Sequence, residues 1–224
     1  MHTGLMPTMV SDSVKMWAGK NGINITNDQL SLLSAHQERV LETNKHMNLT
    51  AITCPQDFAV KHIIDSFTLL PYIPKNANVA DIGTGAGFPG LVLAIMREDI
   101  KVTLIDSLRK RVFFLREVID ELRISNVIAV HSRAEDLARK GMEFDICTAR
   151  AVAAMDKLAK WVLPITAPGG TFIAMKGPDI TEELENAKPT LAKQGGFIKR
   201  VDLVEIAPGL SHSIVVVEKP IPPK

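Results

Sequence analysis

Only two cysteines, Cys54 and Cys147, occur among the 224 residues, and they lie far apart with no metal-ligand spacing. This scarcity argues against a disulfide framework and against a cysteine-based metal site. Two unpaired thiols are instead typical of a protein kept in a reducing compartment. We therefore expect a cytoplasmic location and no bound metal.

The sequence also lacks long hydrophobic runs and a surplus of either charge. No apolar run reaches the length of a membrane span, so we expect no membrane partner. The first ten residues lack the basic and apolar regions of a secretory signal. With 26 basic and 25 acidic residues the net charge is +1, so any binding to nucleic acid has to rely on a local basic patch.

Hydrophobic residues make up 46% of the chain, which is enough for one packed domain. The sequence contains no internal repeats. Residues 1–75 predict a helical extension. Apolar residues follow Thr26 and Asn27 at helical spacing, and either residue could cap that helix. A second helix is expected at about residues 55–70.

From residue 76 onward, short apolar runs mostly alternate with helix-length segments. Pro71 and Pro74 interrupt the chain just before, and they place a boundary between residues 1–75 and a domain at 76–224. This rhythm predicts βαβ units and a parallel sheet. The expected strands cover residues 79–82, 101–105, 127–131, 144–149 and 171–175.

The C-terminal region breaks this rhythm. Phe197–Ile206 and Ser213–Val217 both read as strands, and only a short turn around Pro208 and Gly209 separates them, which predicts a hairpin. A mostly parallel seven-stranded sheet that ends in an antiparallel hairpin is the Rossmann-like architecture of class I methyltransferases. Nucleotide-binding dehydrogenases usually continue with further βαβ units, so the hairpin favours the first of these α/β folds.

The helix after the second strand has the clearest amphipathic pattern. Ser107 could cap it, and Phe113 and Phe114 are expected in the core beside its buried stripe. The residues expected in that stripe are Leu108, Val112, Leu115, Ile119 and Leu122.

Four glycines stand where the first strand meets the next helix: Gly83, Gly85, Gly87 and Gly90. Glycine permits a tight turn and a close approach of a ligand to the backbone. The start of the helix offers N–H groups and a positive dipole end to an anionic group. Residues 85–90 also match the dinucleotide pattern G-x-G-x-x-G, so the loop alone leaves the ligand open, and a turn without any ligand is the plainer alternative.

Two acids and one aromatic residue narrow the choice. Asp81 lies where methyltransferases place an acid that faces the methionine end of S-adenosylmethionine, although a buried cap on the loop N–H groups is an equal alternative. Asp106 ends the second strand, where a carboxylate can hold the ribose hydroxyls of either kind of cofactor. Phe88 has little core to enter from a glycine loop, so we expect it to contact the cofactor or a base.

Several longer phrases resemble one family, the bacterial 16S rRNA guanine-N7 methyltransferases, also called glucose-inhibited division protein B. Its blocks appear here in the same order over roughly residues 40–218. The most selective are KHIIDS upstream of the glycine loop and LIDSLRKRVFFL after it. The other blocks are Asn48-Leu49-Thr50, DIGTGAGFPG at 81–90, SRAEDL at 132–137, ARAV at 149–152, Pro168-Gly169-Gly170 and Met175-Lys176-Gly177.

The resemblance implies an S-adenosylmethionine-dependent enzyme that methylates N7 of a guanine in the decoding region of 16S rRNA or the small ribosomal subunit. The family's usual arginine before the last strand is replaced here by His212, which would make any contact made there weaker or dependent on pH. The cofactor residues implied by the resemblance are Gly83, Phe88, Ala134, Glu135 and Arg150, to which we add Asp81, Gly85 and Asp106 from the loop and the strand ends.

Guanine N7 carries a lone pair and no proton, so its methylation needs alignment rather than a general base. No nucleophile–base constellation is evident near the motifs, which agrees with that chemistry. Arg150 and Lys176 follow the fourth and fifth strands at the ligand rim of such a sheet, so we expect them to be the catalytic residues that hold RNA or the base. Simple salt bridges are the alternative.

Two further polar groups have weaker interpretations. Arg109-Lys110-Arg111 lies in the first turn of its helix, where cations oppose the helix dipole, and it could bind RNA phosphate or merely be a solvated face. His62, beside Lys61 and Asp65, could belong to the substrate site or be a structural histidine.

Two other functions compete with methyl transfer. An NAD-dependent oxidoreductase could use the same glycine loop, and a non-catalytic RNA-binding or assembly factor could keep the fold. The hairpin and the lack of a second catalytic domain argue against the oxidoreductase. We expect the protein to act as a monomer.

Overall fold

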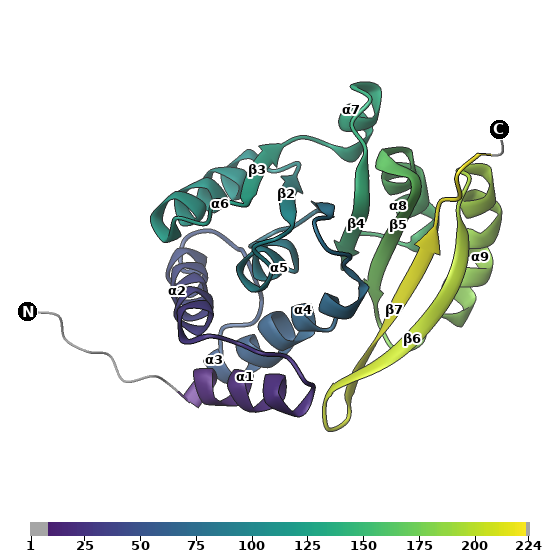
Figure 1. Cartoon of the computed structure of the whole chain (residues 1–224). Coiled ribbons are helices and arrows are strands. Elements are labelled where there is room, and N and C mark those ends of the chain that lie inside the picture. Colours follow the sequence, from purple (N-terminus) through teal and green to yellow (C-terminus); the bar gives the residue numbers. More distant parts are fainter. Residues whose placement is uncertain (1–8, 223–224) are drawn as a thin grey trace, which may run out of the picture.

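The computed structural model describes residues 9–222, and their central element is one seven-stranded sheet (Figure 1). The strand order is β3-β2-β1-β4-β5-β7-β6. Strands β1 to β5 are parallel, and β7 runs antiparallel between β5 and β6. The strands are β1 (Asn78–Ile82), β2 (Lys101–Asp106), β3 (Val127–His131), β4 (Phe144–Arg150), β5 (Thr166–Lys176), β6 (Phe197–Ala207) and β7 (Leu210–Glu218).

The five expected parallel strands and the terminal hairpin are confirmed, with β5 beginning five residues before the expected start. Ala207 pairs with Leu210 across the hairpin turn, and Gly209 has a φ of +74° that a side chain would disfavour. Successive strands are added on one side of β1 up to β3 and on the other side from β4 onward, so the direction of winding reverses between β1 and β4. Ligands of open α/β sheets bind beyond the carboxyl ends of strands at such a point.

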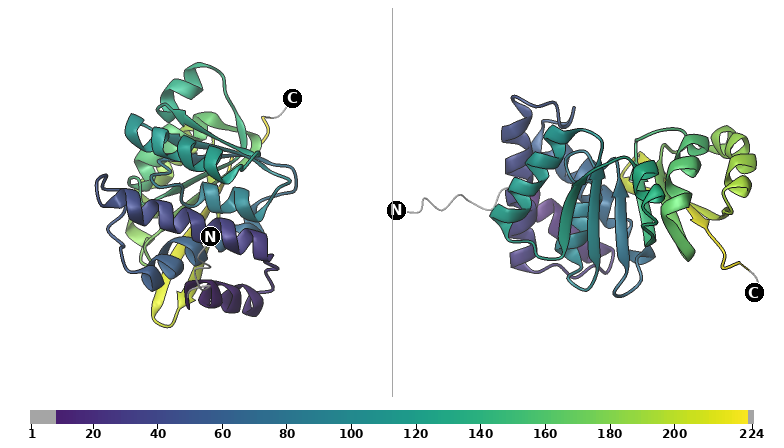
Figure 2. Two further views of the ribbon diagram at one scale, coloured as in Figure 1. Left: turned by 90° about the vertical axis from the view of Figure 1, so that its left-hand side faces the viewer. Right: turned by 90° about the horizontal axis from the view of Figure 1, so that it is seen from above.

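Helices cover both faces of the sheet, as the view from above shows (Figure 2). One face carries α5 (Gly90–Met96) and α6 (Arg109–Leu122), and the other carries α7 (Ala134–Arg139), α8 (Met155–Val162) and α9 (Thr181–Lys193). The N-terminal helices lie on the α5 and α6 side. They are α1 (Met9–Lys20), α2 (Asn27–Asn44), α3 (Pro55–Phe58), the π-helical turn η1 (Ala59–Ile64), α4 (Asp65–Phe67) and the 3₁₀ turn η2 (Leu70–Tyr72). A second 3₁₀ turn, η3 (Leu163–Ile165), joins α8 to β5 and packs on the α7–α9 side.

Alternate residues of the inner strands enter different hydrophobic clusters. In β5, Phe172 packs toward the α7–α9 side and Ile173 toward the α5–α6 side, and in β7 the same holds for Val215 and Val216. Because both faces are covered, these strands read as continuous apolar runs rather than as alternating ones. That is why the sequence shows them so clearly.

The helical extension shares its core with the sheet. Leu33 of α2 and Phe58 of α3 belong to the same cluster as Leu91 of α5 and Leu115 of α6. Thr26 is the N-cap of α2, as one of the two expected candidates, and it forms a capping box with Gln29. The extension is therefore fixed to the side of the sheet by buried apolar contacts.

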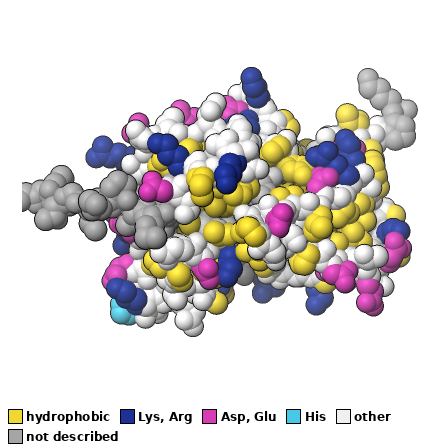
Figure 3. Space-filling view, turned by 90° about the horizontal axis from the view of Figure 1, so that it is seen from below, with side chains coloured by type: hydrophobic (Ala, Val, Ile, Leu, Met, Phe, Trp, Pro, Cys, Tyr) yellow, Lys and Arg dark blue, Asp and Glu magenta, His cyan; other side chains and the backbone are white. Residues whose placement is uncertain are grey.

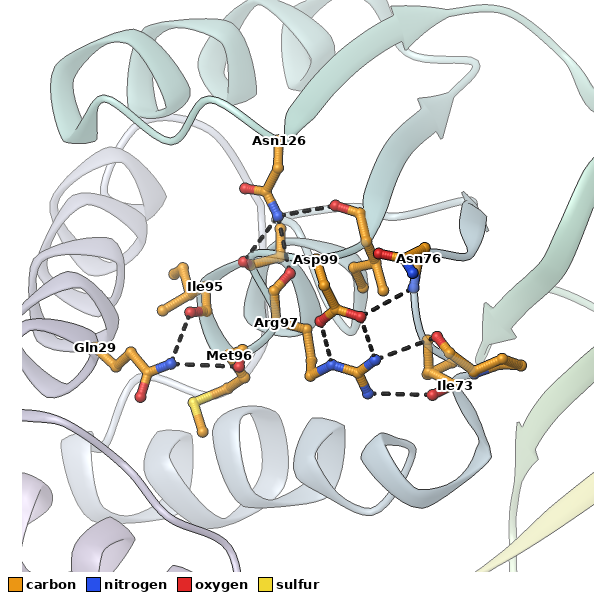
Figure 4. Close-up of polar contacts among 11 residues, drawn as sticks. Gln29, Ile73, Asn76, Ile95, Met96, Arg97, Asp99 and Asn126 are labelled. Carbon is orange, nitrogen blue, oxygen red and sulfur yellow. Dashed lines mark hydrogen bonds and ion pairs between the residues drawn. The ribbon is translucent and has the colours of Figure 1, made fainter.

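Polar contacts add a second attachment at the far end of α5 (Figure 4). The side chain of Gln29 donates to the carbonyls of Ile95 and Met96, which α5 itself leaves unpaired. Asn126 donates to three carbonyls around the loop that follows α5, and Arg97 pairs with Asp99. These bonds fix the loop between α5 and β2.

Helix α6 differs from expectation at its start. Its N-cap is Leu108 without a side-chain cap, so the assignment of that role to Ser107 is wrong. Leu108 precedes the helix and is 43% exposed, and Phe113 points away from the buried stripe and is 63% exposed, so neither belongs to the core. Phe114 is buried, as expected.

Candidate functional site

Three neighbouring cavities follow the carboxyl ends of the parallel strands. The first, here called the β2 cavity, has about 320 Å³ and includes Gly83 and Asp106 in its wall. The loop cavity, of about 330 Å³, lies on the other side of Gly83 and reaches Arg150. The β5 cavity, also about 330 Å³, continues from Arg150 to Lys176 and His212. Gly83 and Arg150 thus each separate two adjoining cavities.

The glycine loop owes its path to positive backbone angles. Gly83, Gly85 and Gly87 have φ values of +68°, +60° and +99°, which side chains rarely adopt. A Cβ atom on Gly83 would lie 2.7 Å from a methyl group of Val152, which also lines the β2 cavity. A side chain at this position would therefore collide with Val152 and disturb the wall of the β2 cavity.

Asp81 lies fully buried under the loop. Its Oδ2 accepts from Gly90 N at 2.8 Å and from the Thr84 hydroxyl at 2.6 Å, while Oδ1 accepts from the Thr148 hydroxyl at 3.1 Å. Burial raises the pKa of Asp81 to about 6. These contacts match the expected alternative of a buried cap, and they occupy the Gly90 N–H that the sequence offers to a ligand. Asp81 contributes to none of the three cavity walls.

Asp106, Ala134 and Glu135 come together in the wall of the β2 cavity. The carboxylate of Asp106 also supports the loop: Oδ2 accepts from Gly85 N at 3.0 Å and Oδ1 from Leu108 N at 2.8 Å. Ala134 and Glu135 begin α7, directly after β3. The structure therefore brings Asp106 together with the adjacent pair Ala134 and Glu135, from which α6 and β3 separate it in sequence.

Phe88 has more core around it than its place in a glycine loop suggests. It is 3% exposed, and its ring is stacked between His36 and His62, with centroids 4.8 and 4.6 Å away. The premise that it lacks a core is therefore wrong, although it still lines the loop cavity. Burial lowers the pKa of His36 to about 4 and that of His62 to about 3, so both rings are neutral at pH 7.

Arg150 ends β4 and reaches into the helical extension. Its Nη1 donates to Lys61 O and to Asp65 Oδ2, both at 2.9 Å, and its Nη2 lies 3.0 Å from His62 Nδ1. The guanidinium also lies over the Phe88 ring at 5.5 Å. Arg150 does not line the β2 cavity, and its place is between the loop cavity and the β5 cavity.

Lys176 ends β5 and is held by two groups. Its Nζ lies 2.5 Å from Glu183 Oε1 and donates to Ala153 O at 2.6 Å. The side chain is 11% exposed. The expected alternative of a salt bridge is therefore present in this structure, and it lies in the wall of the β5 cavity.

His212 faces the helical extension from β7. Its Nδ1 lies 2.8 Å from Asp65 Oδ1, and its Nε2 lies 3.3 Å from the Thr68 hydroxyl. Burial alone would raise the pKa of Asp65, but His212 and Arg150 together lower it below its ordinary value. His212 thus belongs to the same polar network as Arg150, through their shared partner Asp65.

Three residues of the site gave no usable signal in the sequence, and a fourth, Val152, had one only as part of the ARAV block. Trp161 lines the β2 cavity together with Val152, Glu183 lines the β5 cavity, and His36 Nε2 donates to the loop at Ala86 O, at 2.8 Å. Glu183 lies in the first turn of α9, a helix that was not among the expected elements. Their neighbours in sequence do not distinguish them, because tertiary packing alone brings them to the site.

Over residues 9–222, no cluster of histidine, cysteine and acidic side chains could hold a metal ion. Within the same described part, no helix is long and apolar enough to cross a membrane.

Solved structures of methyltransferases share this fold. TYW2 from M. jannaschii, in complex with AdoMet, matches with a TM-score of 0.57 and 20% identity, over 70% of this chain and 76% of its own. TrmN from Thermus thermophilus matches with a TM-score of 0.54 and 21% identity, over 69% of this chain and 48% of its own. At this identity the likeness shows the fold alone.

Sequence relatives are much closer. A protein of Clostridium perfringens (strain SM101 / Type A), named Ribosomal RNA small subunit methyltransferase G, is 44% identical over 214 residues, 93% of this chain and 90% of its own. A protein of the same name from Desulforamulus reducens is 42% identical over 92% of this chain and 89% of its own. The model of the rRNA small subunit methyltransferase G family, GidB, matches residues 29–208. The chain therefore belongs to the rRNA small subunit methyltransferase G family.

Proposed function

We propose that this enzyme transfers the methyl group of S-adenosylmethionine to N7 of a guanine in 16S rRNA, in the decoding region of the small ribosomal subunit. The observation that supports this most directly is the row of three adjoining cavities, with Gly83 and Arg150 at their two boundaries. The β2 cavity and the loop cavity would together hold an elongated cofactor, and the β5 cavity would hold an acceptor base.

The β2 cavity suits the adenosine part of the cofactor. Asp106 is placed to accept from ribose hydroxyls, and the start of α7 at Ala134 and Glu135 would lie beside the adenine. The methionine part would pass Gly83 into the loop cavity, which Gly83, Gly85 and Phe88 line. The residues present therefore fit S-adenosylmethionine.

The bound cofactor would supply an activated methyl group on a sulfonium. On accepting this methyl group, the guanine would take up the positive charge that the sulfonium carried. N7 loses no proton, so no general base is needed. The protein contributes alignment of the two reactants in a closed site, and Arg150 lies at the boundary where they would meet.

The acceptor guanine has to leave its stack for N7 to reach the methyl group. We place it in the β5 cavity, beside Arg150 and Lys176. The RNA backbone would be held near the rim by Arg109 and Lys110, which are exposed in the first turn of α6. On the face shown in Figure 3, basic and acidic side chains are interspersed, so that face offers no broad basic surface.

A methyl-transfer assay tests this proposal. Purified protein, S-adenosylmethionine with a labelled methyl group and unmethylated small subunits should give label in 16S rRNA, and Gly83→Asp should give none. Ligand-induced thermal stabilisation provides a second test. S-adenosylhomocysteine should raise the unfolding temperature and NADH should not. Stabilisation by NADH alone, or wild-type protein without methyl transfer, would overturn the proposal.

A further inference from the structure

We infer that the β5 cavity reads the acceptor as a guanine, with Glu183 as the residue that determines this specificity. The inference rests on the proposed function and deepens it by assigning the base contacts. The volume of the β5 cavity, about 330 Å³, lies in the range of small-ligand pockets, about 300–1,000 Å³. Its wall offers a cation and a carboxylate next to each other, Lys176 and Glu183.

Glu183 is held in place by the protein through only one of its oxygens. Oε1 accepts from Met155 N at 2.7 Å and lies 2.5 Å from Lys176 Nζ. Among the described residues, nothing bonds to Oε2, and the side chain is 33% exposed. One carboxylate oxygen is therefore fixed by the start of α8, while the other remains available to a ligand.

The order of these groups matches the edge of a guanine. Beyond N7, the base presents O6, which accepts a hydrogen bond, and then N1–H and the N2 amino group, which donate. With N7 at the boundary between the loop cavity and the β5 cavity, Lys176 can donate to O6. The free Oε2 of Glu183 has two lone pairs and can accept from both N1–H and the N2 amino group. Adenine presents a donor in place of O6 and an acceptor at N1, so it mismatches both side chains.

The carboxylate also suits the change of charge during the reaction. Methylation of N7 makes the purine cationic, which strengthens the donor character of N1–H. A fixed carboxylate at N1–H therefore interacts more strongly with the transition state than with the free base. Glu183 should accordingly affect kcat as well as KM.

The Glu183→Gln variant tests the assignment. Oε1 of the new amide can keep its contact with Met155 N, which leaves the Nε2 amino group facing two donors of the base. We expect kcat/KM for small subunits to fall by about 10-fold or more. Glu182→Gln, one residue away and exposed, is the matched control and should keep wild-type kinetics.

Inosine in place of the target guanosine separates base reading from a structural role. Inosine lacks only the N2 amino group, so small subunits reconstituted with it at that position should lower kcat/KM of the wild type by about 10-fold. The Glu183→Gln variant should treat the two bases within about twofold of each other. The same discrimination in both proteins, or a wild type that does not discriminate, would overturn the inference.

The affinity for S-adenosylhomocysteine and the unfolding temperature complete the test. Both should be unchanged in Glu183→Gln if the residue reads the base. A loss of both would assign Glu183 to the support of α8 and overturn the inference. Methyl transfer by the wild type without discrimination contradicts only the inference, whereas the absence of methyl transfer contradicts the proposed function.

Discussion

Arg150 Nη1 lies 2.9 Å from Asp65 Oδ2, and this ion pair joins the end of β4 to the helical extension. Both side chains are largely buried, at 18% and 12% exposure. His212 supports the same carboxylate from β7. The extension is thereby tied to the sheet at the site itself, in addition to their shared hydrophobic core.

Replacing Arg150 should therefore affect both activity and stability. Arg150→Ala leaves the buried carboxylate of Asp65 with one partner fewer, which costs about 3 kcal/mol of unfolding free energy. Arg150→Lys keeps the charge but loses the paired contacts with Lys61 O and His62, so it should be more stable yet still poorly active. Methyl-transfer rates and denaturant unfolding measure both effects. Wild-type turnover in Arg150→Lys would show that catalysis does not need the guanidinium group.

Asp106→Ala should weaken cofactor binding by about 10- to 100-fold, because both a ribose partner and the support of Gly85 N are lost. RNA binding should change much less. Calorimetry with S-adenosylhomocysteine and filter binding of RNA compare the two affinities, with Asp136→Ala on α7 as the control. An equal loss of both affinities would show that Asp106 acts only on the fold.

The buried histidines predict a loss of stability in acid. The pKa of His36 falls from 6.5 to about 4 on folding, so between these values the unfolded chain binds a proton that the folded protein does not. The unfolding free energy should therefore fall as pH drops below 6.5, by about 1.4 kcal/mol per pH unit for this residue. His36→Phe keeps an aromatic ring against Phe88 and removes the titration.

Denaturant unfolding at pH 7, 6 and 5 should accordingly give a shallower pH dependence for His36→Phe than for the wild type. Asp81 acts in the opposite direction between about pH 4 and 6, because its pKa is raised, but it does so in both proteins. The exposed residue His46 supplies the control, His46→Phe. Parallel curves for wild type and His36→Phe would contradict the neutral, buried state of His36.

Arg109 and Lys110 should contribute to RNA binding through charge alone. The double alanine variant should lower the slope of log Kd against log salt concentration by about 1.5, since each phosphate contact contributes about 0.7 to 0.9. Cofactor affinity should be unchanged. The control removes Lys188 and Lys193, two exposed lysines of α9. An unchanged salt slope in the Arg109 and Lys110 variant would show that these residues form only a solvated face.

Local patterns were sufficient for most of the sheet. The inner strands are apolar on both faces, and the turn at Pro208 and Gly209 is short enough to force a hairpin. The capping box at Thr26 is likewise a local signal. These features depend on residues close together in sequence, and they could be predicted for that reason.

Tertiary contacts decided what local patterns left open. Asp81 could face a ligand or the loop, and only the approach of Thr148 from β4 completes its set of donors. Phe88 is buried because α2 and η1 bring His36 and His62 to its two faces. Lys176 meets Glu183 because α9 packs beside α8, over the α7–α9 side of the sheet.

The most direct test of this account is mass spectrometry of 16S rRNA after incubation of unmethylated small subunits with the purified protein and S-adenosylmethionine. One new 7-methylguanosine is expected in the decoding region, and it should be absent when Gly83→Asp replaces the wild type. A methyl group on another atom or another base, or no methyl group at all with wild-type protein, would contradict it.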